Sequence, residues 1–291
     1  MRQNTLSPEQ QQQEQQQEQQ RVLNMRSADT SPGDARNPLD ERPAVEEAQH
    51  WWTPGRIAVV AILWVIGLIA LALLSVAAHS SPTFPGDVGI EEAIQRIQQP
   101  QLVAFINFAS DANWPKPAGV IAIVVIVLLA LLRQFRAAIC AAVAGFGADL
   151  ANVTLNSAVA RPRPHNVQIH VVAHLGLHSY PSGHVTHVTA FYGFLLYLAI
   201  AEWRAHPGWR VWLWAPVAIC VYFLIFIGPS RVLEGEHWPS DVVGSWLLGG
   251  LMLVVAIALY HLLARLWERI HSRHERASSA GDAPAAPQSA A

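Results

Sequence analysis

The sequence is poor in charge and in cysteine. Only 14% of its 291 residues are Asp, Glu, Lys or Arg, and two are cysteines, Cys140 and Cys220. Both cysteines lie inside apolar runs, where a thiol is usually a small buried hydrophobe, so we predict no disulfide and no thiolate metal site. The formal net charge of −2 and the lack of a basic tract give no indication of nucleic-acid binding.

Apolar residues, by contrast, make up 52% of the chain and fall into long blocks. A helix needs about 20 apolar residues to cross a hydrocarbon core. We therefore predict an all-α, polytopic membrane protein in which residues 51–275 form a bundle of six transmembrane helices. The predicted spans are 57–78, 118–132, 137–159, 185–201, 211–227 and 242–263. The second span is short, and we expect Trp114 and Lys116 to anchor its outer end.

The two ends of the chain have little apolar surface to bury. Residues 10–20 form a tract of Gln and Glu, which predicts that residues 1–50 are a disordered cytoplasmic tail. The small residues of the segment 276–291 favour disorder there as well.

The basic residues indicate how the predicted helices cross the membrane. They gather before the first span, between the second and third, between the fourth and fifth, and after the sixth, at Arg42, Arg56, Arg133, Arg136, Arg204, Arg210, Arg265, Arg269, Arg273 and Arg276. All of these positions fall on one side of the predicted bundle. The positive-inside rule then predicts cytoplasmic termini in a cell inner (plasma) membrane, with the other loops facing the outside or the periplasm.

The outer loop at residues 79–117 is predicted to be partly helical. Apolar residues at positions 90, 93, 94 and 97 lie on the face opposite Glu91, Glu92 and Gln95. We expect this apolar face to rest on the membrane surface. The alternative is a lid that packs on the bundle and has no part in substrate entry.

The third predicted span contains polar residues at helical spacing. Asp149, Asn152 and Asn156 are three and four residues apart, so they share one face of the helix. Two interpretations remain open at this point. The residues either form hydrogen bonds between helices that only pack the bundle, or they form a polar stripe beneath an outward-facing site.

Two polar motifs follow that span. In the first, Arg161-Pro162-Arg163-Pro164, the prolines stop the helix and keep the backbone extended, which presents both arginines at the membrane surface. By itself this pattern is also typical of contacts to lipid headgroups. In the second, Pro181-Ser182-Gly183-His184, Ser182 is a natural N-cap and Gly183 allows a ligand to approach the backbone. A helix start of this kind predicts an anion site, with His184 beside it to give or take a proton.

Four histidines lie in or near the loop between these motifs. His170, His174 and His178 are spaced by four, which in a helix would stack them in a metal-ligand pattern, and His165 precedes them. No cysteine or carboxylate completes a ligand set in that loop, so we predict no metal site there. His187, one turn beyond His184, is interpreted as a helix-packing residue.

The third motif is the stretch 230–241, which contains Arg231, His237 and Asp241. Pro239 suits the first position of a helix, from which Asp241 can reach back toward His237. A carboxylate on one ring nitrogen fixes the tautomer and leaves the other nitrogen free as a nucleophile, while Arg231 offers donors to an oxyanion. The predicted topology brings all three motifs to the outer ends of the helices, an arrangement that suits a transferred phosphoryl group.

The ordered set of motifs, over about residues 51–273, resembles the type 2 phosphatidic acid phosphatase (PAP2) superfamily. The resemblance implies that His237 attacks phosphorus to form a phosphohistidine and that Asp241 orients its ring. His184 would protonate the leaving group and then activate water. The implied phosphate ligands are Arg163, Arg231, Ser182, Gly183 and Asn156, with Arg161 and Asp149 as possible supporting residues. No metal or other cofactor is implied.

The position of Asn156 departs from the family pattern, which has a lysine there. The amide can donate hydrogen bonds but carries no charge. The sequence is compatible with three functions. The first is a membrane lipid phosphate or diphosphate phosphatase, the second is a phosphotransferase with a lipid or sugar acceptor, and the third is a non-catalytic lipid-binding membrane protein.

Overall fold

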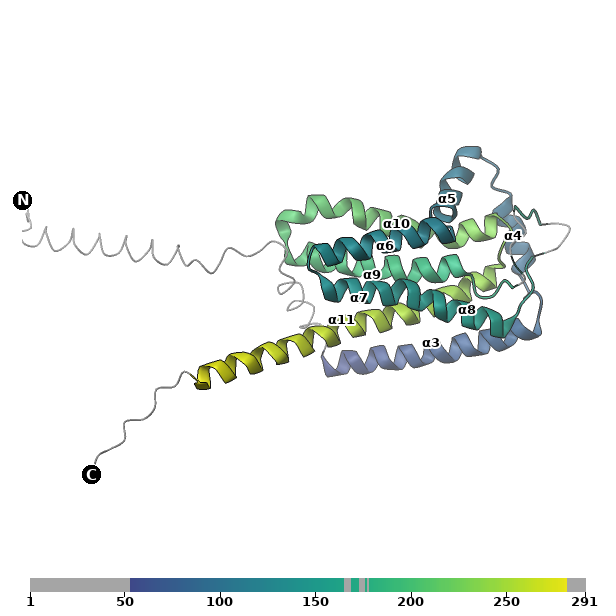
Figure 1. Cartoon of the computed structure of the whole chain (residues 1–291). Coiled ribbons are helices and arrows are strands. Elements are labelled where there is room, and N and C mark those ends of the chain that lie inside the picture. The colour runs from purple at the N-terminus through teal and green to yellow at the C-terminus, as the bar shows by residue number, and fades with distance from the viewer. Residues whose placement is uncertain (1–52, 165–168, 173–175, 177, 282–291) are drawn as a thin grey trace, which may run out of the picture. The chain divides into compact units, whose positions relative to one another are not determined.

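The computed structural model describes residues 53–164, 169–172, 176 and 178–281. Within these ranges every regular element is helical, and the only β-type pairing is an isolated antiparallel bridge between Pro162 and His178. All of the described helices belong to one compact unit, Glu41–Ala291 (Figure 1). The predicted N-terminal tail at residues 1–50 lies outside the described residues.

Among the described residues, five helical segments are long and apolar enough to cross a membrane, which agrees with the predicted all-α, polytopic architecture. They are α3 (Pro54–Ser80), the segment Phe135–Val159, α9 (Gly183–Ala205), the segment Pro207–Leu233, and α11 (Pro239–Gly281) up to Ile270. The segment Pro207–Leu233 joins a short 3₁₀ turn, η2 (Pro207–Trp209), to α10 (Arg210–Leu233).

The second predicted span is a bent pair of helices. α5 (Pro100–Ala112) and α6 (Pro115–Leu131) meet at 65°, and the pair completes a sixth span if it is counted as one. Pro115 explains the break, because it has no N–H to continue the hydrogen-bond ladder of α5 and it favours an extended Trp114 before it. Trp114 is indeed the extended N-cap of α6.

The central helix of the bundle is α9, which packs on both α10 and α11 (Figure 1). Its apolar residues Val185, Val188, Phe191 and Phe194 have no exposed surface, so this helix supplies much of the core. On α3, by contrast, most of the large aliphatic side chains face away from the protein, as expected of a helix that borders lipid.

The third span is continuous but contains a π-helical turn that the sequence did not reveal. It consists of α7 (Phe135–Ala142), η1 (Val143–Gly147) and α8 (Ala148–Val159). The polar face of α8 meets α9: the Asp149 carboxylate pairs with Nδ1 of His187 at 3.0 Å, and Asn152 donates to the Thr186 hydroxyl at 3.0 Å. These contacts match the interpretation in which the polar residues of the third span join helices.

The outer helix α4 (Asp87–Gln95) packs on the bundle through its polar side. Asp87 and Glu91 are buried, and Gln95 bonds to the protein through both ends of its amide, whereas Ile90 is 51% exposed. The polar face therefore points toward the bundle, because it meets an arginine and unpaired backbone groups there. Ile90 is turned outward, which agrees with the predicted separation of the two faces, and the contact of the apolar face with the membrane stays a prediction.

The last helix, α11, is longer than predicted and continues to Gly281. The prediction that disorder begins at residue 276 is therefore wrong for residues 276–281, which extend the helix without a break. Residues 282–291 lie outside the described part of the chain.

A close packing contact between α11 and the loop before α9 gives a stability prediction. A Cβ at Gly244 would lie 2.6 Å from Cζ of Tyr180, whose ring is fully buried, whereas a Cβ at Gly250 on the same helix would meet nothing within 4 Å. We expect Gly244→Ala to lower the free energy of unfolding by about 1–3 kcal/mol through overpacking. Gly250→Ala is the matched control, and it should leave stability unchanged or raise it by up to about 1 kcal/mol. Thermal unfolding in detergent measures both, and equal behaviour of the two variants would contradict this packing.

Candidate active site

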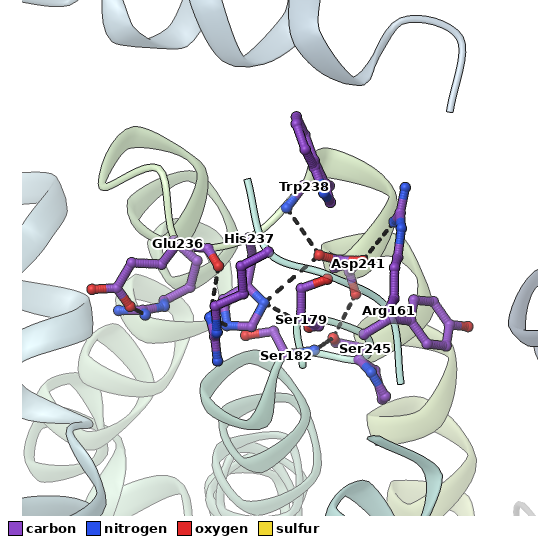
Figure 2. Close-up of polar contacts among 12 residues, drawn as sticks. Arg161, Ser179, Ser182, Glu236, His237, Trp238, Asp241 and Ser245 are labelled. Atoms are coloured by element: carbon purple, nitrogen blue, oxygen red, sulfur yellow. Dashed lines mark hydrogen bonds and ion pairs between the residues drawn. The ribbon is translucent and has the colours of Figure 1, made fainter. Parts of the chain in front are cut away.

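The predicted motif residues come together at one end of the helix bundle. Here α8 and α10 end while α9 and α11 begin, so the segments after Val159, before Gly183 and between Leu233 and Pro239 are neighbours (right side of Figure 1). Helix ends are natural places for polar chemistry, because their terminal N–H and C=O groups lack partners inside the helix. Figure 2 shows His237 and Asp241 at the centre of this cluster.

The geometry around His237 fixes its tautomer. Nδ1 lies 2.8 Å from the backbone carbonyl of Ser179, and a carbonyl can only accept, so Nδ1 carries the proton. Nε2 is then unprotonated and accepts from Nη1 of Arg163 at 3.2 Å. Burial, followed by the charges of Arg163 and Arg231, lowers the pKa of His237 well below its usual 6.5. The ring is thus neutral at physiological pH, with an unprotonated Nε2 that can act as a nucleophile.

Asp241 lies on the Nδ1 side of His237, as predicted, but makes no hydrogen bond to it. Its Oδ2 is 3.8 Å from Nδ1 of His237, beyond hydrogen-bond distance, and it accepts instead from the Trp238 backbone N–H at 2.9 Å. The prediction that the Asp241 carboxylate fixes the tautomer is therefore corrected, because the Ser179 carbonyl makes that hydrogen bond. As predicted, Pro239 is the first residue of α11, and the Asp241 carboxylate caps the start of this helix.

The two arginines of the first motif have separate roles. Arg161 has no exposed surface and pairs through Nη1 with Asp241 at 2.6 Å, so its predicted presentation at the membrane surface is wrong. Arg163 is half-buried and donates to His237 and to the backbone carbonyl of Glu236 at 2.7 Å. Arg163 therefore lies at the reactive nitrogen, while Arg161 lies on the side of Asp241 away from His237 (Figure 2).

Arg231, in the last turn of α10, is fully buried, and carboxylates beside it balance its positive charge. It forms ion pairs with Glu234, at 2.5 Å, and with Glu236, and its guanidinium donates to the Ser110 hydroxyl. Its Nε has no hydrogen-bond partner among the described residues. One donor of Arg231 thus has no protein partner in that part of the chain, and its contact with an oxyanion stays a prediction.

The start of α9 offers further unused polar atoms. Ser182 is the N-cap residue and its backbone N–H donates to Ser245 at 2.6 Å, but its hydroxyl is buried and has no partner in the described part of the protein. Nε2 of His184 is likewise buried and without a hydrogen-bond partner there. The Trp114 ring packs against His184 and also lies 5.9 Å from the Arg231 guanidinium, so His184 and Arg231 are both close to the same indole. Buried polar atoms are rarely left unpaired, so this arrangement indicates a site for a polar ligand.

The two remaining predicted phosphate ligands contact the loop before α9. The side-chain amide of Asn156 donates to the backbone carbonyls of Tyr180, at 3.1 Å, and Pro181, at 3.4 Å. A Cβ at Gly183 would lie 3.4 Å from Oδ1 of Asn152, so the close approach at this glycine is to α8. Asn156 thus supports the backbone of the second motif, a role different from the predicted direct contact with phosphate.

Several residues of this site were missed by sequence reasoning. Ser179 acts through its backbone carbonyl, so its side chain leaves no signal in the sequence. Glu234 and Glu236 stand within the third motif and could have been suggested as partners of Arg231, since all three are close in the chain. Ser110 and Trp114 come from a distant segment, and only the fold brings them to Arg231.

The structure describes two of the four histidines of the histidine-rich loop, and neither is in a helix. His170 and His178 lie in non-helical backbone, with His178 in the bridge to Pro162, while His165 and His174 are outside the described residues. Among the residues that the structure describes, no three His, Cys, Asp or Glu side chains are grouped in a way that could hold a metal ion. His187, interpreted as a packing residue, is buried and bonded to Asp149.

Known proteins resemble this chain in both sequence and fold. The PAP2 superfamily model matches residues 135–265. The chain is 31% identical over 122 residues to a lipid A 1-phosphatase of Rhizobium etli, covering 40% of this chain and 46% of the relative. It is 29% identical over 82 residues to an undecaprenyl-diphosphatase of Sulfolobus acidocaldarius, covering 28% and 34%. The matches thus span less than half the length of these relatives.

The structure is also similar to a solved membrane protein. The crystal structure of a transmembrane PAP2 type phosphatidylglycerolphosphate phosphatase from Bacillus subtilis matches with a TM-score of 0.56 and 20% identity. The match covers 67% of this chain and 94% of that one. At this identity the likeness concerns the fold, and it agrees with an all-helical membrane architecture.

A buried carboxyl beside the site gives a prediction about pH. Glu91 has no exposed surface and neither carboxyl oxygen has a hydrogen-bond partner among the described residues; burial, with the charges of Asp87 and Asp241, raises its pKa from 4.5 to about 8. Between these values the folded protein keeps a proton that the unfolded chain has lost. The contribution of Glu91 to the free energy of unfolding is therefore fully present below pH 4.5. It declines by about 1.4 kcal/mol per pH unit as the pH rises toward 8, where the folded protein also loses the proton.

The variant Glu91→Gln should lack this decline, because the amide is neutral at every pH. Thermal unfolding in detergent between pH 5 and pH 8 is the measurement, and the gap in melting temperature between the variant and the wild type should widen in favour of the variant as the pH rises. Glu92→Gln, at the half-buried next position, is the control and should follow the wild type. The assignment fails if Glu91→Gln keeps the pH dependence of the wild type.

Proposed function

We propose that this chain, whose residues 135–265 match the PAP2 superfamily model, is a member of that superfamily and an integral-membrane phosphatase that hydrolyses a lipid phosphate or lipid diphosphate. The observation that carries the proposal is the state of His237: a neutral ring held at Nδ1 by the Ser179 carbonyl, with its Nε2 beside the guanidinium of Arg163. A nucleophile and a cation at the same point suit attack on an anionic phosphorus centre.

The first half of the proposed reaction makes a phosphohistidine. Nε2 of His237 forms a bond to phosphorus while the bond from phosphorus to the ester or anhydride oxygen breaks. Arg163 and the free Nε of Arg231 stabilise the negative charge on the phosphoryl oxygens, and the Ser182 hydroxyl donates to the same group. His184 gives a proton to the leaving oxygen.

The second half returns the enzyme to its starting state. His184, now unprotonated, takes a proton from water as the water oxygen attacks phosphorus, and the bond to Nε2 of His237 breaks. The products are inorganic phosphate and either the lipid alcohol, from a phosphomonoester, or the lipid monophosphate, from a diphosphate. The Ser179 carbonyl stabilises the cationic ring of the intermediate, since it accepts from Nδ1–H throughout.

The relatives suggest the substrate class and the location. Lipid A 1-phosphatase, undecaprenyl-diphosphatase and phosphatidylglycerolphosphate phosphatase all act on phosphorylated lipids, which supports a lipid substrate for this chain. The apolar helices that lead to the site would bring such a lipid from the bilayer. The arginines that flank the spans gather at the end of the predicted bundle opposite the site. By the positive-inside rule we therefore place the site at the outer face of the inner (plasma) membrane and both termini in the cytoplasm.

Removal of the nucleophile tests the proposal directly. We expect purified wild-type protein in detergent to release inorganic phosphate from at least one of phosphatidic acid, phosphatidylglycerol phosphate and a polyprenyl diphosphate. His237→Ala should fall to the background rate, because no other group replaces Nε2. His206→Ala, at the other end of α9, is the matched histidine control and should keep activity. Equal release from wild type and His237→Ala would refute the mechanism, and transfer of label to an acceptor lipid in place of phosphate release would indicate the phosphotransferase.

The role of His184 is tested by trapping the intermediate. A substrate with a good leaving group needs little acid assistance, so His184→Ala should still become phosphorylated but should lose the phosphoryl group slowly. Labelled protein quenched in alkali should therefore accumulate in His184→Ala and be absent from the double variant with His237→Ala. Label that persists in the double variant would show that another residue is the nucleophile.

A further inference from the structure

The outer helix α4 contacts the site through its first residue. Asp87 is 3% exposed, and its Oδ2 accepts from Nη2 of Arg161 at 2.9 Å and from the Ser240 hydroxyl at 2.8 Å. Its Oδ1 accepts from the Ser240 backbone N–H at 3.1 Å, and Oδ2 also holds the Phe84 N–H at 2.8 Å. One carboxylate thus ties the loop after α3 to the first turn of α11.

Arg161 links Asp87 to Asp241, which is nearer to His237. Its guanidinium lies between two buried carboxylates, with Nη2 on Asp87 and Nη1 on Asp241 at 2.6 Å, and Nη1 also donates to the Ser240 hydroxyl at 2.7 Å. Arg161 is completely buried, so no water competes with these partners. Removal of one partner of a buried ion pair leaves charge uncompensated, so both carboxylates matter for the position of Arg161.

Two short paths lead from Arg161 to His237. In the first, the backbone carbonyl of Arg161 accepts from the Ser179 N–H at 2.7 Å, and the Ser179 carbonyl holds Nδ1 of His237 at 2.8 Å. In the second, the side chain of Arg161 holds Asp241, whose other oxygen accepts from the Trp238 N–H at 2.9 Å, directly beside His237 in the chain. Figure 2 draws Arg161, Ser179, Asp241 and Trp238, the residues of both paths, near the His237 ring.

We propose that Asp87 is a positioning residue for the reaction at His237, acting through Arg161 and Ser240 on the peptide segments that orient the imidazole. The inference rests on the proposed function, since it concerns the step that His237 carries out. Asp87 lies in the outer loop, 153 residues before Ser240 and 74 residues before Arg161, and belongs to none of the three motifs.

The carboxylate is needed for its charge as well as for its shape. In Asp87→Asn the amide is similar in size, but it turns an N–H group toward donors and leaves Asp241 as the one carboxylate on Arg161. The guanidinium then moves toward Asp241 and draws it further from His237, while the Ser240 N–H loses its anionic acceptor. A small displacement of a nucleophile is sufficient to slow a reaction by about 10²-fold.

The test compares Asp87→Asn with Glu92→Gln, a carboxylate-to-amide change on the same helix. Phosphate release from the best lipid phosphate should show a fall in kcat of about tenfold or more in Asp87→Asn, with KM within about twofold of the wild-type value. Glu92→Gln should match the wild type in both constants. If Asp87 only anchors α4, Asp87→Asn should lower the melting temperature without a selective fall in kcat at nearly constant KM.

A second readout does not depend on activity. Nitrogen-15 spectra of protein labelled in the histidine rings report the tautomer of His237, whose signals are those missing from His237→Ala. The wild type should show protonated Nδ1 and free Nε2, and Asp87→Asn should shift these signals, whereas Glu92→Gln should not.

Each outcome bears on the proposal. Wild-type kcat and unchanged ring signals in Asp87→Asn overturn it, and so does an equal loss in Glu92→Gln. If Asp87→Asn does not fold, Ser240→Ala decides, because it removes only the hydroxyl links and should lower kcat in the same direction by a smaller factor. If the wild type releases no phosphate from any lipid, the proposed function fails, and the ring signals alone then decide whether Asp87 positions His237.

Discussion

The site depends on the burial of Arg161 between Asp87 and Asp241. An isolated charge in such a place would cost several kcal/mol, so each of the three groups needs the other two. This constraint joins parts of the chain that are far apart: the loop after α3, the segment after α8 and the first turn of α11. The loop that contains Ser179 is held to the same arginine through its backbone. The segments around His237 are thus held together by buried ion pairs and hydrogen bonds in a region that excludes water; we call these segments the frame of the site.

The helices explain why this frame can sit at the end of an apolar bundle. The polar face of α8 turns toward α9, where the amide of Asn152 bonds to Pro181 and Thr186, and Asn156 bonds to the backbone before the helix. These contacts fix the start of α9, which carries Ser182 and His184. On the other side, Arg231 is held at the end of α10 by two glutamates. Each candidate catalytic group is therefore supported by a neighbour that pairs with backbone or charge.

Local patterns in the sequence predicted most of the helices and the positions of the three motifs. Pro239 begins α11 and Ser182 precedes α9, because capping and the missing proline N–H act within a few residues. The short second span was recognised but not its bend at Pro115. For α4 the periodicity showed two unlike faces, but it did not show which of them meets the bundle. That depends on Arg161 and on backbone groups that periodicity does not contain.

The sequence by itself determined which residue types are available for phosphoryl chemistry and the helix ends at which they stand. Spacing along a helix or at a cap is a short-range property, so His237, His184 and Arg163 could be selected from it. Only the tertiary structure decided which groups hold them. Ser179 and His237 are 58 residues apart, and Asp87 and Arg161 are 74 residues apart. Backbone carbonyls look the same in every sequence, and the partner of a buried charge is chosen by packing, so neither the Ser179 contact nor the place of Arg161 could be read before folding.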